Sequence, residues 1–243
     1  MKYKYVKIFG ERNTGTNYLS KLIISNFQVQ ELRGTVPKWP LMKSEYARDL
    51  YFRLTHKYNF GWKYSIVNED ILKSNKKYKD TLFLFLVKNP YSFLLSLHRR
   101  PYHNEDFNNL RFGEFINTKW QARSRDSYLN KNFNNPVELW NTKNHSYYNF
   151  YRKNTSNSLL IKYEDLLANN EVILDEISMF LEKKDVDYKY VNESTKGDES
   201  KYEDYKDYYL KEKWRDKLDK EHFILINNKL DSNLAEKLKY VLL

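Results

Sequence analysis

The sequence contains no cysteine, and its 243 residues include only 6 glycines, 5 prolines and 5 histidines. Without thiols, the chain forms no disulfide, zinc–thiolate site, iron–sulfur cluster or cysteine nucleophile. The histidines show no i, i+4 pairing, so we expect no metal site. No run of about 18 apolar residues occurs, and the opening MKYKYVKIFGERN has no apolar segment of signal-peptide length. We therefore expect a soluble, cytoplasmic protein without a transmembrane segment.

Acidic residues are in the minority, with 32 Asp and Glu against 42 Lys and Arg, for a net charge of +10. Such an excess favours an anionic partner: a nucleic acid, a phosphorylated nucleotide, an acidic glycan or a membrane surface. Plain solubility is the alternative explanation. The basic residues are dispersed, so the charge indicates a class of ligand and nothing finer. The hydrophobic content of 41% is enough for a core and excludes wholesale disorder.

Strand-like segments alternate with helical ones along the chain, which predicts one α/β domain over residues 1–243. The run TLFLFLVK is continuous and apolar, as expected of a parallel strand covered on both faces. We expect a P-loop-like three-layer fold with a central parallel sheet flanked by helices. The predicted strands are 3–9, 59–66, 81–88 and 158–163. The predicted helices are 16–27, 91–100, 136–153, one or two after 163, and three in the tail 200–243. Segments 29–58 and 101–135 are predicted insertions; the first is expected to be irregular, and the second to contain loop or short helices.

Gly10 and Gly15 have the Gly-x4-Gly spacing of a phosphate-binding P-loop, between a predicted strand and a predicted helix. Backbone N–H groups at such a helix N-terminus converge on an anion. A triphosphate-cleaving P-loop next needs Lys and then Ser or Thr, but this chain has Thr16 and Asn17. Arg12 instead supplies a cation within the loop. An ordinary strand–turn–helix connection is the alternative interpretation.

A second anion site is indicated by Lys88 and Ser96. Lys88 follows a buried strand, at the end where open α/β sheets bind ligands. Ser96 lies about two helical turns into the next helix, which can bring both side chains onto one phosphate. The alternative is a strand-end lysine and a helix serine that both face solvent.

In this order, the two segments resemble the sulfotransferase family that uses 3′-phosphoadenosine 5′-phosphosulfate (PAPS). Residues 12–19 (RNTGTNYL) resemble the family's 5′-phosphosulfate loop, and Lys88-Asn89-Pro90 with Ser96 resembles its 3′-phosphate element. Residues 163–166 (YEDL) resemble its strand-to-helix turn, and the closing LDSNLAEKLKYVL resembles the last helix of bacterial members.

The resemblance implies sulfuryl transfer from PAPS to a hydroxyl or amine acceptor without a metal. Lys63, in a GWKY segment similar to Gly-Trp-Lys-His of bacterial relatives, is the implied catalytic residue beside the leaving phosphate. The implied donor-binding residues are Arg12, Asn13, Thr14, Gly15, Thr16, Asn17, Lys88, Ser96 and Lys196, the last in a segment similar to a mobile basic loop of the family. The general base stays open among His56, Glu69, Asp70, His98 and His103.

Three departures from the family pattern stand out. Arg12 lies three places before Gly15, where the family's basic residue usually lies two places before the glycine. Lys88 replaces a common arginine and offers a point charge instead of a bidentate fork. Tyr64 stands where bacterial relatives have a histidine, and a phenol with an ordinary pKa is a poor base.

Segments 29–58 and 101–135 have no counterpart in the family, and we expect them to form the acceptor side. Their mixture of aromatic and basic residues favours a sugar or an anionic glycan over a flat apolar phenol or steroid. Two other functions compete with this interpretation. A P-loop small-molecule or nucleoside kinase lacks support because the P-loop lysine is missing. A nucleic-acid-binding protein would need clustered basic residues with interleaved aromatics, and here they are scattered, so we expect no nucleic-acid partner.

Overall fold

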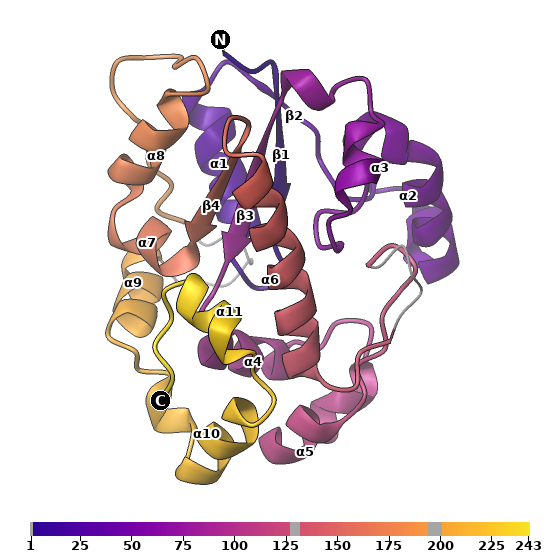
Figure 1. Ribbon diagram of the computed structural model, residues 1–243, viewed down its shortest axis with the longest axis vertical. Coiled ribbons are helices and arrows are strands. Elements are labelled where there is room, and N and C mark those ends of the chain that lie inside the picture. The colour runs from indigo at the N-terminus through magenta and orange to yellow at the C-terminus, as the bar shows by residue number, and fades with distance from the viewer. Residues whose placement is uncertain (1, 127–131, 194–200) are drawn as a thin grey trace.

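The computed structural model describes residues 2–126, 132–193 and 201–243 (Figure 1). Within those residues, four parallel strands form one sheet in the order β2-β1-β3-β4. The strands are β1 (Tyr5–Phe9), β2 (Gln30–Glu31), β3 (Thr81–Val87) and β4 (Ser158–Lys162). The predicted fold class, an α/β fold with a central parallel sheet flanked by helices, is confirmed.

Helices follow the strands along the chain, and further helices lie in the last described segment, residues 201–243. They are α1 (Thr16–Asn26), α2 (Glu45–Asn59), α3 (Glu69–Lys73), α4 (Pro90–Arg99), α5 (Phe112–Asn117), α6 (Pro136–Lys153), α7 (Tyr163–Ala168), α8 (Asn170–Ser178), α9 (Tyr202–Leu210), α10 (Lys220–Asn227) and α11 (Ser232–Lys237). Helices α9 to α11 confirm the predicted helical tail. In the described part of the chain, no helix combines the length and apolarity needed to cross a bilayer.

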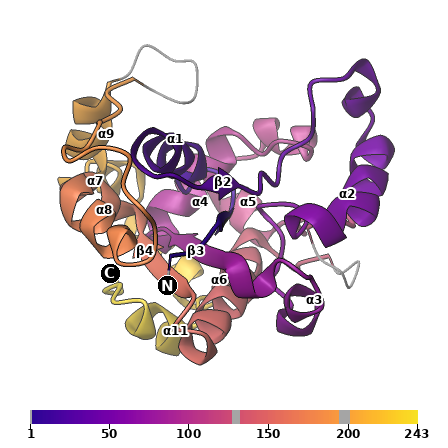
Figure 2. The ribbon, with the colours of Figure 1, turned by 90° about the horizontal axis from the view of Figure 1, so that it is seen from above.

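Strand β3 is the centre of the hydrophobic core, and all of its side chains are buried. Leu82, Leu84 and Leu86 pack on one face with residues of α1 and α8. The alternate residues of β3, including Phe83 and Phe85, pack on the other face with residues of α6. Figure 2 shows α1 and α6 on opposite sides of the sheet. Both faces are covered, so the strand is apolar at every position from Leu82 to Val87.

The predicted strand over residues 59–66 is wrong. Helix α2 ends at Asn59, and the next two residues, Phe60 and Gly61, both have left-handed backbone conformations (φ 60° and 77°). Extended backbone cannot pass through two such residues, so the chain turns. The turn docks on the first loop, because the Gly10 amide donates to the Lys63 carbonyl oxygen at 3.1 Å.

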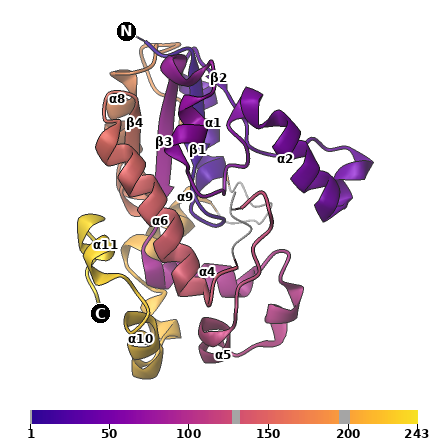
Figure 3. The ribbon, with the colours of Figure 1, turned by 45° about the vertical axis from the view of Figure 1, so that its right-hand side comes forward.

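The prediction that residues 29–58 are irregular is also wrong. The segment contains the short edge strand β2 and the helix α2. Ser44 caps α2 by accepting a hydrogen bond from the Ala47 amide, and Glu45 stands in the first helical turn. Figure 3 shows α2 at one side of the molecule, away from the sheet.

We expect Leu84→Ala to lower the free energy of unfolding by about 2–5 kcal/mol, because it leaves a cavity where the sheet meets α1 and α8. The matched control is Leu54→Ala, since the Leu54 side chain is 62% exposed. The control should change stability by less than about 0.5 kcal/mol. Urea denaturation of the two variants and the parent measures the difference, and equal losses would contradict the packing described.

Candidate anion-binding site

The loop between β1 and α1 presents the N-terminus of α1 to an open position. Asn13 and Gly15 both have positive φ (67° and 88°), which bends the chain sharply before the helix. A Cβ atom on Gly15 would lie 2.6 Å from the Tyr163 ring, so a larger residue does not fit there. The first turn of α1 has no side-chain cap and no acidic residue. Its amide groups are therefore available to an anion.

Lys88 and Ser96 lie together beside this loop. The Lys88 Nζ donates to Ser96 Oγ at 3.1 Å and to the Asn13 carbonyl oxygen at 3.3 Å. The two side chains meet because α4 begins directly after the strand end and carries Ser96 back over it. Both residues are buried. The interpretation of these residues as solvent-facing side chains is therefore wrong.

Aromatic rings and a buried carboxylate hold the Lys88 segment in place. The Lys88 ammonium lies 4.0 Å from the ring centre of Tyr209 and 5.1 Å from that of Tyr163. Glu164 accepts a hydrogen bond from the Asn89 amide at 3.0 Å, just ahead of α4. The Asn89 side chain in turn caps α4. The Tyr-Glu segment that resembles the family's turn thus supports the lysine directly.

Lys63 approaches the loop from the turn that follows α2. Its Nζ donates to Asn17 Oδ1 and lies 5.0 Å from the ring centre of Tyr64. The residue is 6% exposed, and burial lowers the pKa of Lys63 to about 8, although Glu31 acts in the opposite direction. Lys63 is therefore mainly a cation at pH 7.

The two lysines share an unusual electrostatic situation. Among the described residues, neither Lys63 nor Lys88 has a carboxylate within ion-pair distance, and their hydrogen-bond acceptors are neutral. A buried ammonium without a counter-charge is costly, because burial removes its hydration. Lys63 contacts Asn17 and Lys88 contacts Asn13, four residues apart on the same loop. The arrangement leaves two positive charges for a bound anion to neutralise.

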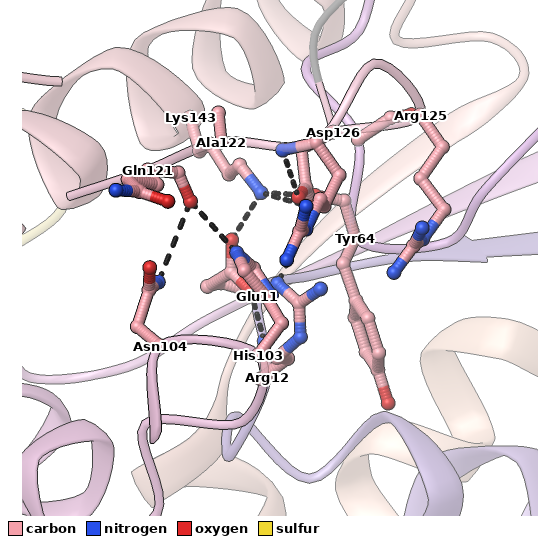
Figure 4. A network of polar contacts seen from close by, with 12 residues as sticks. Glu11, Arg12, Tyr64, His103, Asn104, Gln121, Ala122, Arg125, Asp126 and Lys143 are labelled. Atoms are coloured by element: carbon pink, nitrogen blue, oxygen red, sulfur yellow. Dashed lines mark hydrogen bonds and ion pairs between the residues drawn. The ribbon is translucent and has the colours of Figure 1, made fainter. Parts of the chain in front are cut away.

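Arg12 has a different role from the one that the sequence predicts for it. Its guanidinium donates to Glu11 at 3.1 Å and to Asp126 at 3.3 Å. Lys143, from α6, contacts both carboxylates (Figure 4). Burial acts to lower the pKa of Arg12, but Asp126 and Glu11 outweigh it, so the pKa is raised. The Arg12 charge is therefore already compensated, and Arg12 fixes the loop from within.

The other predicted loop residues either hydrogen-bond within the protein or differ in their exposure to solvent. Asn13 donates to the Ser96 carbonyl oxygen and accepts from the Tyr102 hydroxyl. Thr14 donates to the Glu11 carbonyl oxygen at 2.6 Å and is buried. Thr16 is buried at the start of α1, whereas Asn17 is exposed. Lys196 lies outside the described residues.

The candidate general bases are not equivalent. Glu69 is bound to Lys73 and Asn154, and Asp70 is on the same helix, α3. His98 contacts the Leu110 carbonyl oxygen and packs on Phe112 and Phe115.

The other two candidate bases are His103, which lies beside Arg12 (Figure 4), and His56 on α2. Burial lowers the pKa of His103, assisted by Arg12, and Figure 4 shows the two residues side by side. Burial also lowers the pKa of His56 to about 4. Both rings are therefore neutral at pH 7 and able to accept a proton.

The sequence analysis missed four residues that shape the site. Glu11, Asp126 and Lys143 form the buried network with Arg12, but they are far apart in the sequence and belong to no motif. Tyr209 belongs to a tail with many tyrosines. Its ring covers Lys88, and its hydroxyl lies 3.3 Å from Ser96 Oγ. Of these four residues, only Glu11 could have been suspected from the sequence, because it lies inside the loop.

Comparisons with known proteins give no family for this chain. No protein-family model matches it, and no curated protein was found to match its sequence. In the described residues, no group of three or more histidines or carboxylates is arranged to hold a metal ion. The site is thus defined by its own geometry: a helix N-terminus with a buried lysine on either side.

We expect Asp126→Asn to lower the free energy of unfolding at pH 7 by roughly 3–5 kcal/mol, because it leaves Arg12 and Lys143 partly uncompensated. Burial acts to raise the pKa of Asp126, but Arg12 and Lys143 outweigh it, so its pKa lies below the ordinary value. The parent gains stability from this carboxylate above about pH 4 and loses it as the pH falls, because the unfolded chain is protonated first.

The stability difference between parent and variant should therefore shrink below about pH 4. Urea denaturation from pH 7 to pH 3 measures it, with Asp216→Asn at an exposed carboxylate as the control. A difference that stays constant down to pH 3 would show that Asp126 is not held by the two cations.

Proposed function

We propose that this protein is a PAPS-dependent sulfotransferase, an enzyme that transfers a sulfuryl group to a hydroxyl or amine acceptor. The observation that carries the proposal is the pair of buried lysines, Lys63 and Lys88, on either side of one helix N-terminus. Each is placed to neutralise an anionic group, and each contacts a different end of the loop. A donor with a 5′-phosphosulfate and a separate 3′-phosphate has the matching charges.

The assignment of the two lysines follows from their surroundings. Lys88 lies with Ser96 and the Tyr209 hydroxyl, so its neighbours can offer hydrogen-bond donors to a phosphate. We assign it the 3′-phosphate. Lys63 lies against Asn17 at the exposed start of α1, where the helix dipole adds favourable potential. We assign it the bridging oxygen of the 5′-phosphosulfate.

The transfer requires an in-line approach of the acceptor to sulfur. A bond forms between the acceptor oxygen or nitrogen and sulfur, and the bond between sulfur and the bridging oxygen breaks. The electron pair stays on the departing phosphate, where Lys63 and the α1 amides stabilise the growing negative charge. The acceptor's proton passes to a base, for which neutral His56 and His103 are the candidates. Fixed cations perform the electrostatic work in this scheme, so it needs no metal.

The acceptor side is proposed to be built by the segments that surround α2 and residues 101–126. A carbohydrate or glycoconjugate is the proposed acceptor, because these segments combine aromatic rings with guanidinium groups. The competing kinase function would place a triphosphate at the same loop, where Thr16 stands in place of the P-loop lysine.

The protein should bind 3′-phosphoadenosine 5′-phosphate more tightly than adenosine 5′-phosphate, by about tenfold to a hundredfold, because a charged hydrogen bond contributes about 1.5–3 kcal/mol. The double variant Lys88→Met, Ser96→Ala should lose most of that preference while methionine preserves the packing against Tyr209. Titration calorimetry with the two nucleotides, ATP and a generic oligonucleotide measures the affinities.

The matched control is Lys162→Met, which removes the lysine at the end of the neighbouring strand β4, where Nζ contacts the Lys239 carbonyl oxygen. Its discrimination between the nucleotides should equal that of the parent. Tighter binding of ATP or of the oligonucleotide than of the bisphosphate would overturn the proposed function. Unchanged discrimination in the double variant would mean that the 3′-phosphate binds elsewhere.

Lys63→Ala should lower turnover by roughly 10²–10³, because the cation acts mainly as charge develops on the leaving oxygen. Affinity for 3′-phosphoadenosine 5′-phosphate should fall much less. With the pKa of Lys63 lowered to about 8 by burial, kcat/KM of the parent should decline above about pH 8 as the ammonium loses its proton.

Lys63→Arg is the control for charge, because a guanidinium stays protonated throughout this range. It should recover part of the rate and remove the decline centred near pH 8. Sulfuryl transfer followed from pH 6 to pH 10 tests both points. Turnover of Lys63→Ala near the parent value, or an equally large loss of product affinity, would show that Lys63 is structural.

A further inference from the structure

A pocket of about 540 Å³ lies between α2 and the turn that carries Lys63. Residues of α2, the Gly61–Trp62 peptide and Ser124–Arg125 contribute to its lining, and no residue of the loop 10–17 does. The pocket is therefore a different site from the loop described above. Its volume is in the range of small-molecule sites.

Aromatic rings form much of the pocket wall. Phe52 and Trp62 contact each other with ring centres 4.9 Å apart, and Tyr46 is exposed at the rim. Such flat apolar faces pack well against the C–H face of a sugar ring. The lining also contains polar groups, so a wholly apolar ligand would leave them without partners.

The charges around the pocket are unbalanced. Arg125 pairs with both Glu45 and Asp49, and Glu45 also contacts Arg48 and Arg123. Arg53 also lines the pocket, is exposed, and forms no ion pair within the described residues. Among the lining residues, the single carboxylate of Asp49 accompanies the two guanidinium groups of Arg53 and Arg125. The surplus is positive, which favours an anionic ligand.

Two further N–H groups of the lining residues need partners. Trp62 Nε1 and Arg125 Nε are buried and have no hydrogen-bond partner in the described part of the structure. Buried donors are rarely left unpaired in native proteins, and a ligand or a bound water supplies the partner. Both atoms are covered by protein, so the exposed Arg53 is the lining group that a ligand rich in oxygen acceptors would meet.

The pocket is joined to the anion-binding site through one turn. Trp62 lines the pocket, and the next residue, Lys63, reaches Asn17 on α1. The Arg12 guanidinium lies 5.8 Å from the Trp62 ring centre. On the side of the sheet, Lys7 donates to the Gly61 carbonyl oxygen at 2.6 Å and fixes the start of the turn. A ligand in the pocket therefore contacts Trp62, the residue directly before the lysine that would act on the donor.

We infer that this pocket binds the acceptor, and that the acceptor is an acidic sugar whose ring packs against Trp62 and whose carboxylate contacts Arg53. Its identification as the acceptor rests on the proposed function, whereas binding of an acidic sugar does not. In the transfer, a hydroxyl oxygen of the sugar forms the bond to sulfur, the donor's bridging oxygen keeps the electron pair, and the hydroxyl proton passes to the base.

The test compares binding of p-nitrophenyl glucuronide, p-nitrophenyl glucoside and p-nitrophenol to the nucleotide-free protein by calorimetry. We expect the glucuronide to bind roughly three- to fivefold more tightly than the glucoside, as for an exposed ion pair, and p-nitrophenol to bind more weakly than either. Arg53→Gln should abolish the preference for the glucuronide. Tyr46→Ala should weaken both glycosides alike. Both changed side chains are exposed, so the variants should fold.

The matched control is Lys57→Gln, which removes an equal charge one turn further along α2 from a residue outside the pocket lining. It should keep the parent's preference. The inference is overturned if the glucoside binds as tightly as the glucuronide, if Arg53→Gln keeps the preference, or if no glycoside binds. Glycoside binding without any affinity for 3′-phosphoadenosine 5′-phosphate would instead refute the proposed function and leave the sugar site standing.

Discussion

The ion network of Glu11, Arg12, Asp126 and Lys143 is the constraint on which the site depends. Two carboxylates and two cations are buried together, and each charge is tolerated only because the others are present. The network connects the first loop with α6 and with the turn at Asp126. Lys143 also donates to the Tyr64 carbonyl oxygen, which ties in the turn that carries Lys63. Three distant parts of the chain are thereby fixed around one loop.

The internal balance of this network determines which charges are left for a ligand. Arg12 would be the obvious phosphate contact in the loop, but its guanidinium is held by Glu11 and Asp126 and surrounded by the rings of Trp62, Tyr64 and Tyr102. Beside the loop, Lys63 and Lys88 are two buried cations that have no carboxylate within ion-pair distance among the described residues. The departure of Arg12 from the family spacing has a structural counterpart, since one extra residue before Gly15 lets the side chain turn into the interior.

The parts of the site that were predictable from the sequence depend on local spacing. The loop after β1 and the pairing of Lys88 with Ser96 follow from a strand end, a helix start and a fixed helical rise. The network was not predictable, because residues 11, 126 and 143 meet only after the sheet, α6 and the segment before Asp126 have packed. The predicted strand over 59–66 failed for a related reason: its alternating side chains look extended, whereas Phe60 and Gly61 adopt positive φ to place Lys63 against the loop.

The turn between α2 and α3 connects the pocket beside α2 with the start of α1. Trp62 and Lys63 are adjacent in the chain, and their side chains serve different regions, the pocket beside α2 and the start of α1. The turn is held by the Gly34 carbonyl oxygen, the Gly10 amide and the Lys7 ammonium, so it has little freedom to shift. A ligand in the pocket and an anion at the loop are thus positioned against the same rigid peptide. Rigid placement of two reactants is a large part of what an enzyme provides, because it replaces a bimolecular encounter with a fixed geometry.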